Sequence, residues 1–288
     1  MLKNLSNGIF YMLSSSFLGA LNGAIAKTLS SSIPALEIVF FRNMLGVFII
    51  LAMLKHTPSS IDRKNLPLLI LRGFFGFVAM FLFFYTITVI PLGDAITLNK
   101  TSPIFVAILS FLLLNEKLTL FKTVGIILGF TGVVFVAKPN GFELDFPYFL
   151  GIMGGFFAAA AYTTISKIKH IYDSRIIVLS FMGMGSLLPL LLFFIAPYLE
   201  NPLIKEFVLP TDIKSYLLIG FMAITATASQ WLLTKAYSSP NLSMIATISY
   251  SIIPFAVFLG VLLGDSMPDS LTLTGIIMII TAGILAKK

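Results

Sequence analysis

A lysine, Lys100, lies inside an apolar stretch, residues 91–122, that is long enough to cross a bilayer. A lysine at the centre of a membrane helix costs about 2.5–3.5 kcal/mol on insertion scales, so such a residue usually faces a protein interior or a water-filled path. At about 100° per residue, four polar side chains share one face of the predicted helix: Asp94, Thr97, Lys100 and Thr101. This polar stripe predicts a functional surface inside the membrane. The alternative is that Lys100 pairs with a neighbouring carboxylate only for packing.

Two further charges, Glu37 and Arg42, lie in the second apolar segment, with Arg42 about 7.5 Å deeper along a helix. The guanidinium fork of Arg42 suits a carboxylate or phosphate on a substrate. It suits equally an ion pair with Glu37, or with Asp94 from a neighbouring helix. Arg72 lies about two turns from the inner end of its segment, and we expect it to reach lipid phosphate.

Aromatic and amide side chains supply a second set of candidates. Gln230 and Trp231 project close together from one helix, and Trp231 is the only tryptophan in the chain. A buried indole beside an amide suits stacking on a planar substrate, although Trp231 is equally interpreted as a core filler whose N–H is satisfied. Tyr162 and Tyr250 are further candidates for hydrogen bonds to a substrate.

Composition places the whole chain in a membrane. Of the 288 residues, 58% are hydrophobic and 11% are charged, whereas soluble domains carry about 25% charged residues. The chain has no cysteine, which excludes disulfides, thiolate zinc sites and cysteine nucleophiles. Both histidines lie in short polar loops, so we expect no metal site, no cofactor and no catalytic base at membrane depth. We assign the net charge of +7 to cytoplasmic anchors and not to nucleic acid.

The fold class we predict is an all-α integral membrane protein. A span needs about 20 mostly apolar residues, and the fourth span carries Pro103, which predicts a kink. The ten candidate spans are Gly8–Leu29, Ala35–Leu54, Leu66–Val89, Leu92–Leu114, Leu120–Ala137, Pro147–Ile168, Ile176–Pro197, Tyr216–Tyr237, Asn241–Gly264 and Leu271–Ala286.

The distribution of basic residues predicts the orientation. If the N-terminus is cytoplasmic and sides alternate, the outer side holds Lys27, Lys138, Lys205 and Lys214. The inner side holds Lys3, Lys55, Arg63, Lys64, Lys117, Lys122, Lys167, Lys169, Arg175, Lys235, Lys287 and Lys288. This excess of inner basic residues predicts a multi-pass protein of the cell (inner or plasma) membrane with both termini in the cytoplasm.

An internal repeat divides the chain. A shift of 149 residues places Pro91 on Pro240 and Ser102 on Ser251, and a shift of 150 places Gly125 on Gly275. The repeats cover residues 8–137 and 147–286, with five predicted spans each. An odd number of spans means that the second repeat crosses in the opposite direction, which is the inverted topology of many secondary transporters.

These motifs resemble the drug/metabolite transporter superfamily, in its ten-helix form built from two EamA-like repeats. The resemblance is strongest in the first repeat, at Pro91, Ser102, Pro103, Glu116, Gly125, Gly129 and Gly132. The second repeat departs from it, because its proline is Pro254 and Asp265 replaces the glutamate. The resemblance implies transport of a small solute through a central cavity.

We therefore predict a secondary transporter, not an enzyme, that moves a small polar or amphipathic metabolite by alternating access. Lys100 and Arg42 would bind an anionic group, and the surplus of buried cations favours an anionic or zwitterionic solute, amino-acid-like or nucleotide-like. No G-x-x-x-x-G-K-[ST] motif for ATP is present, so we expect the energy to come from an ion gradient or from the solute's own gradient. Asp94 and Glu37 are the candidates for coupling to an ion.

Two alternatives stay open at the level of sequence. A membrane-embedded enzyme would use Arg42, Arg72 and Lys100 as ligands for lipid phosphates, and an accessory protein would transport nothing itself. The expected partners are a small-molecule substrate and the lipid bilayer, without nucleic acid, and the chain is expected as a monomer or homodimer.

Overall fold

The computed structural model describes residues 2–56, 59, 62–114, 119–137, 145–198, 207–237 and 248–285, and every regular element in these ranges is helical. The helices are α1 (Leu2–Leu29), α2 (Ala35–His56), α3 (Leu66–Val89), α4 (Leu92–Asn99), α5 (Ser102–Leu114), α6 (Leu120–Ala137), α7 (Phe146–Ile168), α8 (Ser174–Ile195), α9 (Ile213–Tyr237), α11 (Ile252–Leu262) and α12 (Ser270–Leu285), with short 3₁₀ turns η1 (Ala196–Tyr198) and η2 (Ser249–Ser251).

Six of the described helical segments are long and apolar enough to cross a membrane. They are Gly8–Leu29, Ala35–His56, Leu66–Val89, Phe146–Ile165, Ser174–Tyr198 and Ile213–Ala236. Three shorter apolar segments accompany them: Thr123–Val136, Ser249–Leu262 and Ser270–Ala282. The prediction of an all-helical membrane protein is confirmed at this level.

The predicted fourth span is two helices. α4 ends at Asn99, and Lys100 has φ −77° and ψ 8°, outside the α region. α5 begins at Ser102, so Pro103 lies in a first helical turn, where the missing N–H interrupts no hydrogen bond. The kink that we expected after the polar stripe, at Pro103, therefore lies earlier in the chain, at Lys100 itself.

The ninth predicted span is only partly described. Residues 241–247, at its start, lie outside the described residues, as does Glu116 of the family pattern. The part that is described begins with the 3₁₀ turn η2, which leads directly into α11. The polypeptide thus departs from α-helical geometry before α11 as it does before α5.

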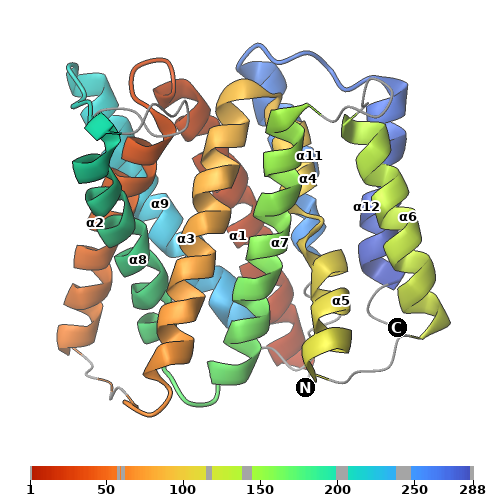
Figure 1. The fold of residues 1–288 in the computed structure, drawn as a ribbon, viewed down its shortest axis with the longest axis horizontal. Coiled ribbons are helices and arrows are strands. Elements are labelled where there is room, and N and C mark those ends of the chain that lie inside the picture. Colours follow the sequence, from red (N-terminus) through yellow and green to blue (C-terminus); the bar gives the residue numbers. More distant parts are fainter. Residues whose placement is uncertain are drawn as a thin grey trace.

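The helices pack mainly with partners that are distant in sequence. α1 packs against α9, α2 against α8, α3 against α7, α4 against α11 and α6 against α12. Figure 1 shows that α1 begins and α12 ends at the same end of the bundle, whereas α7 begins at the opposite end. α6 and α12 stand together at one side of the molecule.

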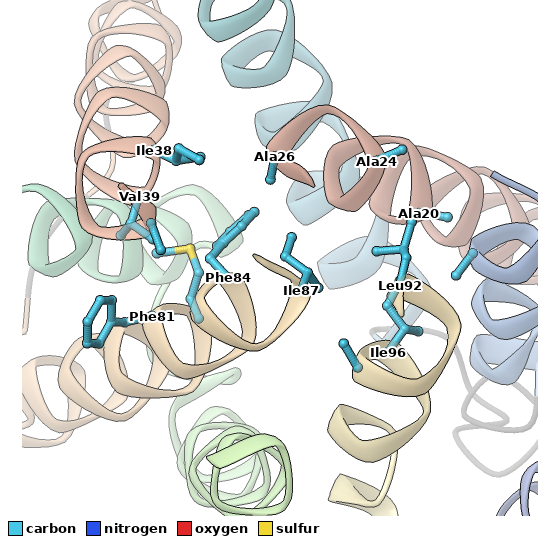
Figure 2. Packing of buried hydrophobic residues seen from close by; sticks show 14 of the residues in the cluster. Ala20, Ala24, Ala26, Ile38, Val39, Phe81, Phe84, Ile87, Leu92 and Ile96 are labelled. Atoms are coloured by element: carbon cyan, nitrogen blue, oxygen red, sulfur yellow. The ribbon is translucent and has the colours of Figure 1, made fainter. Parts of the chain in front are cut away.

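A continuous apolar core joins the first four helices. Figure 2 shows alanines of α1 meeting larger side chains from α2, α3 and α4. Ala20, Ile87 and Leu92 in this cluster are completely buried. Small residues on α1 let the neighbouring helices approach closely, as is common in membranes, where lipid tails supply no hydrophobic driving force.

Candidate functional site: a cationic central cavity

A cavity of about 150 Å³ lies among α1, α2, α3, α4, α7, α8, α9 and α11. Eight helices therefore contribute to one site, and they come from both ends of the sequence. Its polar lining consists of Ser15, Ser16, Asn22, Arg42, Arg72, Asn99, Lys100, Tyr162, Ser229 and Gln230. Three of these are cations, and the described lining residues include no aspartate or glutamate.

Arg42 of α2 lies in the cavity wall, where it contacts a methionine sulfur and an aromatic ring. Its side chain is 5% exposed, Nη1 contacts the sulfur of Met80, and its guanidinium carbon lies 5.5 Å from the ring centroid of Phe84. Nε has no hydrogen-bond partner among the described residues. Within the described part of the chain, the predicted alternative of an ion pair with Glu37 or Asp94 is not formed.

Glu37 takes a different position from the one that such a pair requires. It is buried, and its Oε1 accepts a hydrogen bond of 3.1 Å from the backbone N–H of Val208, in the segment before α9. It does not line the cavity. The carboxylate thus joins α2 to the chain between α8 and α9.

Arg72 corrects a prediction. We expected this residue to extend to lipid phosphate, but its side chain is only 4% exposed and lines the cavity. Its guanidinium carbon lies 5.0 Å from the ring centroid of Phe181 on α8, and Nε and Nη1 have no hydrogen-bond partner among the described residues. Tyr162 lies close enough for an electrostatic interaction.

The position of Arg72 follows from the glycines beside it. A Cβ on Gly73 would lie 2.6 Å from the backbone oxygen of Ser180, and one on Gly76 would lie 2.5 Å from the Phe181 ring and collide with Nη1 of Arg72. Positions i and i+4 share one face of a helix, so Arg72 and Gly76 both face α8. Residues 71–77, LRGFFGF, indicate in the sequence that this face is packed, because closely spaced glycines are typical of the packed face of a membrane helix and not of the lipid face.

Lys100 lines the cavity at the break between α4 and α5. Its ammonium has neither a hydrogen bond nor an ion pair with any described residue, so the predicted alternative of a packing pair is not formed there. Neighbouring Asn99 also lines the cavity. The break itself is one reason that these side chains reach the interior, since non-helical backbone at membrane depth occurs where it is buried in protein or lines a cavity.

The polar stripe predicted around Lys100 does not form one surface. The hydroxyls of Thr97 and Thr101 donate to the carbonyls of Gly93 and Leu98, at 2.7 Å each, and neither residue lines the cavity. The stripe assumed an uninterrupted helix, and α4 ends before Lys100. Serine and threonine often satisfy their hydroxyls on their own helix in this way.

Asp94 lines a second pocket, which has a volume of about 250 Å³ and is also lined by Tyr148, Asp265 and Asp269. We call it the outer pocket because it lies beside the start of α7, at the end of the bundle that the basic residues predict to face outward (Figure 1). The Tyr148 hydroxyl donates to Oδ2 of Asp94 at 3.5 Å. The sequence predicted Asp94 and Lys100 on one polar stripe, but Asp94 lines the outer pocket and Lys100 lines the central cavity.

An ion pair lies beside the outer pocket. Nζ of Lys27, at the end of α1, pairs with Oδ1 of Asp265. The other oxygen of Asp265, Oδ2, accepts a hydrogen bond of 2.9 Å from the backbone N–H of Leu92, the first residue of α4. We call Lys27, Asp265 and the backbone of Leu92 the outer latch, because they join α1, α4 and the segment after α11.

The wall formed by α1 and α9 is polar but uncharged. Ser15 donates to the backbone oxygen of Ser229 at 2.8 Å, Nδ2 of Asn22 donates to Thr225 at 2.9 Å, and Gln230 also lines the cavity. Trp231 is not a lining residue; the ammonium of Lys235 lies 3.6 Å from its ring centroid.

Of the predicted substrate-binding residues, the cavity brings together Lys100, Arg42, Gln230 and Tyr162. Thr97, Thr101, Trp231 and Tyr250 are not lining residues, and Tyr250 is buried in η2. Among the described residues, no group of three histidines, cysteines or carboxylates is placed to hold a metal ion.

The energetic cost of the cavity charges is not offset by the contacts described above. Moving an ion out of water costs several kcal/mol even after relaxation. A cation over an aromatic face recovers about 0.5–2 kcal/mol. Arg42 and Arg72 each have one such contact, so the cavity is electrostatically complementary to an anion.

This arrangement defines a multi-pass helical membrane protein with a cationic central cavity. Comparison with known proteins supports the resemblance seen in the sequence: residues 6–138 match the model of the EamA-like transporter family. This part of the chain is an EamA family domain, and relatives along the whole chain are named as transporters.

Relatives match along almost the whole chain. The pseudopaline exporter CntI of Pseudomonas aeruginosa PAO1 is 28% identical over 285 residues, which is 99% of this chain and 97% of the relative. An S-adenosylmethionine uptake transporter of Rickettsia bellii is 24% identical, covering 98% of this chain and 93% of the relative. A protein of solved crystal structure shares the fold with a TM-score of 0.62 and 18% identity, over 99% of this chain and 96% of that one. The family and the two named relatives are transporters and not enzymes, which supports a small-molecule transporter.

Proposed function

We propose that the chain is a secondary transporter that moves a small anionic or zwitterionic metabolite, amino-acid-like or nucleotide-like, through the central cavity by alternating access. The observation that carries the proposal is the set of three cations that face a cavity without an acidic lining residue in the described chain. In alternating access, the helices rock around this site, and it opens to one side of the membrane at a time.

Lys100 and Arg42 bind the anionic group of the solute in this proposal. Arg42 offers a planar fork that matches carboxylate or phosphate, and Lys100 offers a compact charge. Gln230 and Tyr162 supply hydrogen bonds from other walls. Thr97, Thr101, Trp231 and Tyr250 do not line the cavity, and we assign them a structural role in the helices around it.

An inverted repeat of ten spans, residues 8–137 and 147–286, accounts for the helix pairing. If α1 corresponds to α7, α3 to α9 and α5 to α11, then the packing of α1 on α9 corresponds to the packing of α7 on α3, and the packing of α1 on α11 corresponds to that of α7 on α5. The packing of α2 on α8 and of α6 on α12 then each join equivalent helices.

The helix interruptions support the same repeat. A shift of 149 residues places Lys100 on Ser249 and Ser102 on Ser251, so the break before α5 falls on the turn η2 before α11. A pair of interrupted helices in corresponding positions of two halves is typical of the substrate site of transporters.

The orientation follows from the basic residues. Lys55 ends α2, Arg63 and Lys64 precede α3, and Arg175 begins α8. These helix ends lie at the same end of the bundle as the start of α1 (Figure 1). The positive-inside rule then places this end, with both termini, in the cytoplasm of a cell membrane.

Asp94 is the proposed site of coupling to an ion gradient, with Glu37 as a second candidate. Asp94 lines the outer pocket, and its hydrogen-bond donor there is the Tyr148 hydroxyl. The substitution Asp94→Asn removes the titratable group, so it should abolish proton-driven uptake into vesicles and preserve solute exchange. Intact proton-driven uptake in this variant would remove Asp94 from the coupling role.

Side-specific labelling tests alternating access. The chain has no native cysteine, so Ala158→Cys and Ala226→Cys each place one thiol in the cavity wall. An impermeant thiol reagent should reach each of them from either face of membrane vesicles, and a bound solute should slow the labelling.

Two exposed positions serve as matched controls. Ser31→Cys, between α1 and α2, and His170→Cys, between α7 and α8, should each react from one face only. If the cavity cysteines also react from a single face whatever solute is added, the alternating-access proposal is wrong.

A further inference from the structure

We propose that the transported solute carries at least two separated anionic groups, as a dicarboxylate does, with one group bound by Arg42 and Lys100 and the other by Arg72. This inference rests on the proposed function and narrows its substrate class. It assigns to Arg72 a substrate-binding role that its position in the sequence did not suggest.

The first argument is the balance of charge. Arg42, Arg72 and Lys100 all line the cavity, and none of them forms an ion pair within the described chain. A solute with one carboxylate would neutralise one of these three charges. Two or more negative charges leave far less uncompensated charge away from water.

The second argument is the distance between the two arginines. The Arg42 guanidinium contacts Met80 and Phe84 of α3, whereas the Arg72 guanidinium lies against Gly76 of the same helix. At 1.5 Å per residue, these levels differ by about 6–12 Å along α3. Such a separation suits two acidic groups at the ends of one solute better than one compact phosphate.

The third argument is that each end is a built site. Arg42 is 5% exposed and Arg72 is 4% exposed, so neither samples solvent or lipid freely. Nε of Arg42 and Nε and Nη1 of Arg72 have no acceptor among the described residues. Buried guanidinium donors without an acceptor match the paired oxygens of a carboxylate.

The experiment measures binding of a solute series to the purified full-length protein by calorimetry and thermal shift. The series runs from succinate to suberate, with valerate as the monoacid of the same chain length as glutarate, and with glycerol 3-phosphate as a compact dianion. We expect the best dicarboxylate to bind at least about 10-fold more tightly than its monoacid, which corresponds to 1.4 kcal/mol.

The variants assign that preference to one arginine. Arg72→Gln should reduce binding of the dicarboxylate to the level of its monoacid, and Arg42→Gln should weaken dicarboxylate binding by at least as much. Arg175→Gln is the matched control, because Arg175 pairs with Asp173 outside the cavity. Arg72→Lys retains the charge and should keep part of the advantage, and it serves if Arg72→Gln does not fold.

The outcomes separate this inference from the proposed function. If the monoacid binds as tightly as every dicarboxylate, or if glycerol 3-phosphate binds most tightly, the two-ended site is wrong and an anion transporter remains. The same holds if Arg72→Gln leaves the preference intact. If no anion in the series binds the wild-type protein, the two-ended site is wrong, and the proposed function is then tested by the labelling of the cavity cysteines alone.

Discussion

The outer latch and the central cavity hold buried positive charge in opposite ways. At the outer latch, Lys27 is paired with Asp265, and the two side chains are 21% and 14% exposed. In the cavity, Arg42, Arg72 and Lys100 face no acid among the described lining residues. The outer latch thus contains a complete ion pair, whereas the cavity contains three cations without an acidic partner among the described residues.

The presence of an ion-pair partner separates structural charges from functional ones. A paired charge joins helices and needs nothing further, so the outer latch is explained by the fold alone. An unpaired buried charge lowers the stability of the empty protein, and it is retained only where a ligand supplies the missing partner. The presence or absence of an acidic partner therefore distinguishes the charge of the outer latch from the charges of the cavity.

The largest effect should come from removing a cavity cation. Arg42→Gln should weaken binding of an anionic solute by about 10–100-fold, because hydrogen bonds to charged groups contribute about 1.5–3 kcal/mol. Solute counterflow in liposomes measures the loss. Arg175→Gln, outside the cavity, should behave as wild type, and equal activity of both variants would contradict the comparison.

The next effect concerns the packing that holds Arg72 in the cavity. Gly76→Ala places a methyl group against Phe181 and the Arg72 guanidinium, and overpacking of this kind typically costs about 1–3 kcal/mol. We expect a lower Tm and a weaker preference for dicarboxylates. Gly183→Ala on α8 is the control, since a Cβ there meets nothing within 4 Å; a similar loss in both variants would show that Arg72 does not depend on Gly76.

A smaller effect is expected at the outer latch. Asp265→Asn removes the partner of Lys27 and should destabilise the protein by about 1–2 kcal/mol, between the values for exposed and buried pairs. It should also speed labelling of Ala226→Cys from the outer face. Lys27→Gln should have the same effect, and the double variant should add little to either single one; fully additive effects would mean that the two residues do not act as a pair.

The smallest effect is at the cap of α8, a paired charge outside the membrane. Asp173 accepts hydrogen bonds from the side chain and the backbone N–H of Arg175, and the side-chain hydrogen bond is the main reason that the pKa of Asp173 lies below its ordinary value. Its contribution is present above pH ~3.9, the ordinary value for Asp, and is lost as pH falls through the folded-state pKa. Asp173→Ala should cost about 1 kcal/mol at neutral pH, measured by thermal unfolding against pH, and Asp173→Asn, which keeps the cap, should cost less.

Much of the helical organisation was predictable, because apolar length alone marks a membrane helix. The third span was predicted as Leu66–Val89, and α3 has these bounds. Lys100 was recognisable as an interior residue because its charge is costly at membrane depth. Periodicity could not place the break at Lys100, since it assumes that a helix continues until a proline or a loop.

The composition of the cavity was only half predictable. Lys100 and Arg42 were identified by depth, whereas Arg72 was assigned to lipid because it lies near a helix end. Whether an arginine extends outward or folds inward depends on the neighbouring helix, here α8 with Phe181. A single sequence without three-dimensional contacts does not specify that neighbour, although Gly73 and Gly76 indicated which face was packed.

One measurement tests the central claim most directly: the Tm of Lys100→Met with and without the tightest-binding anion of the dicarboxylate series. If the solute supplies the missing anionic partner of Lys100, the variant without solute should have a higher Tm than the wild type. The solute should then no longer raise the Tm of the variant. Lys27→Met, which breaks a completed pair, should melt below wild type. A Lys100→Met protein that is less stable than wild type, and is still stabilised by the solute to the full extent, would contradict this account.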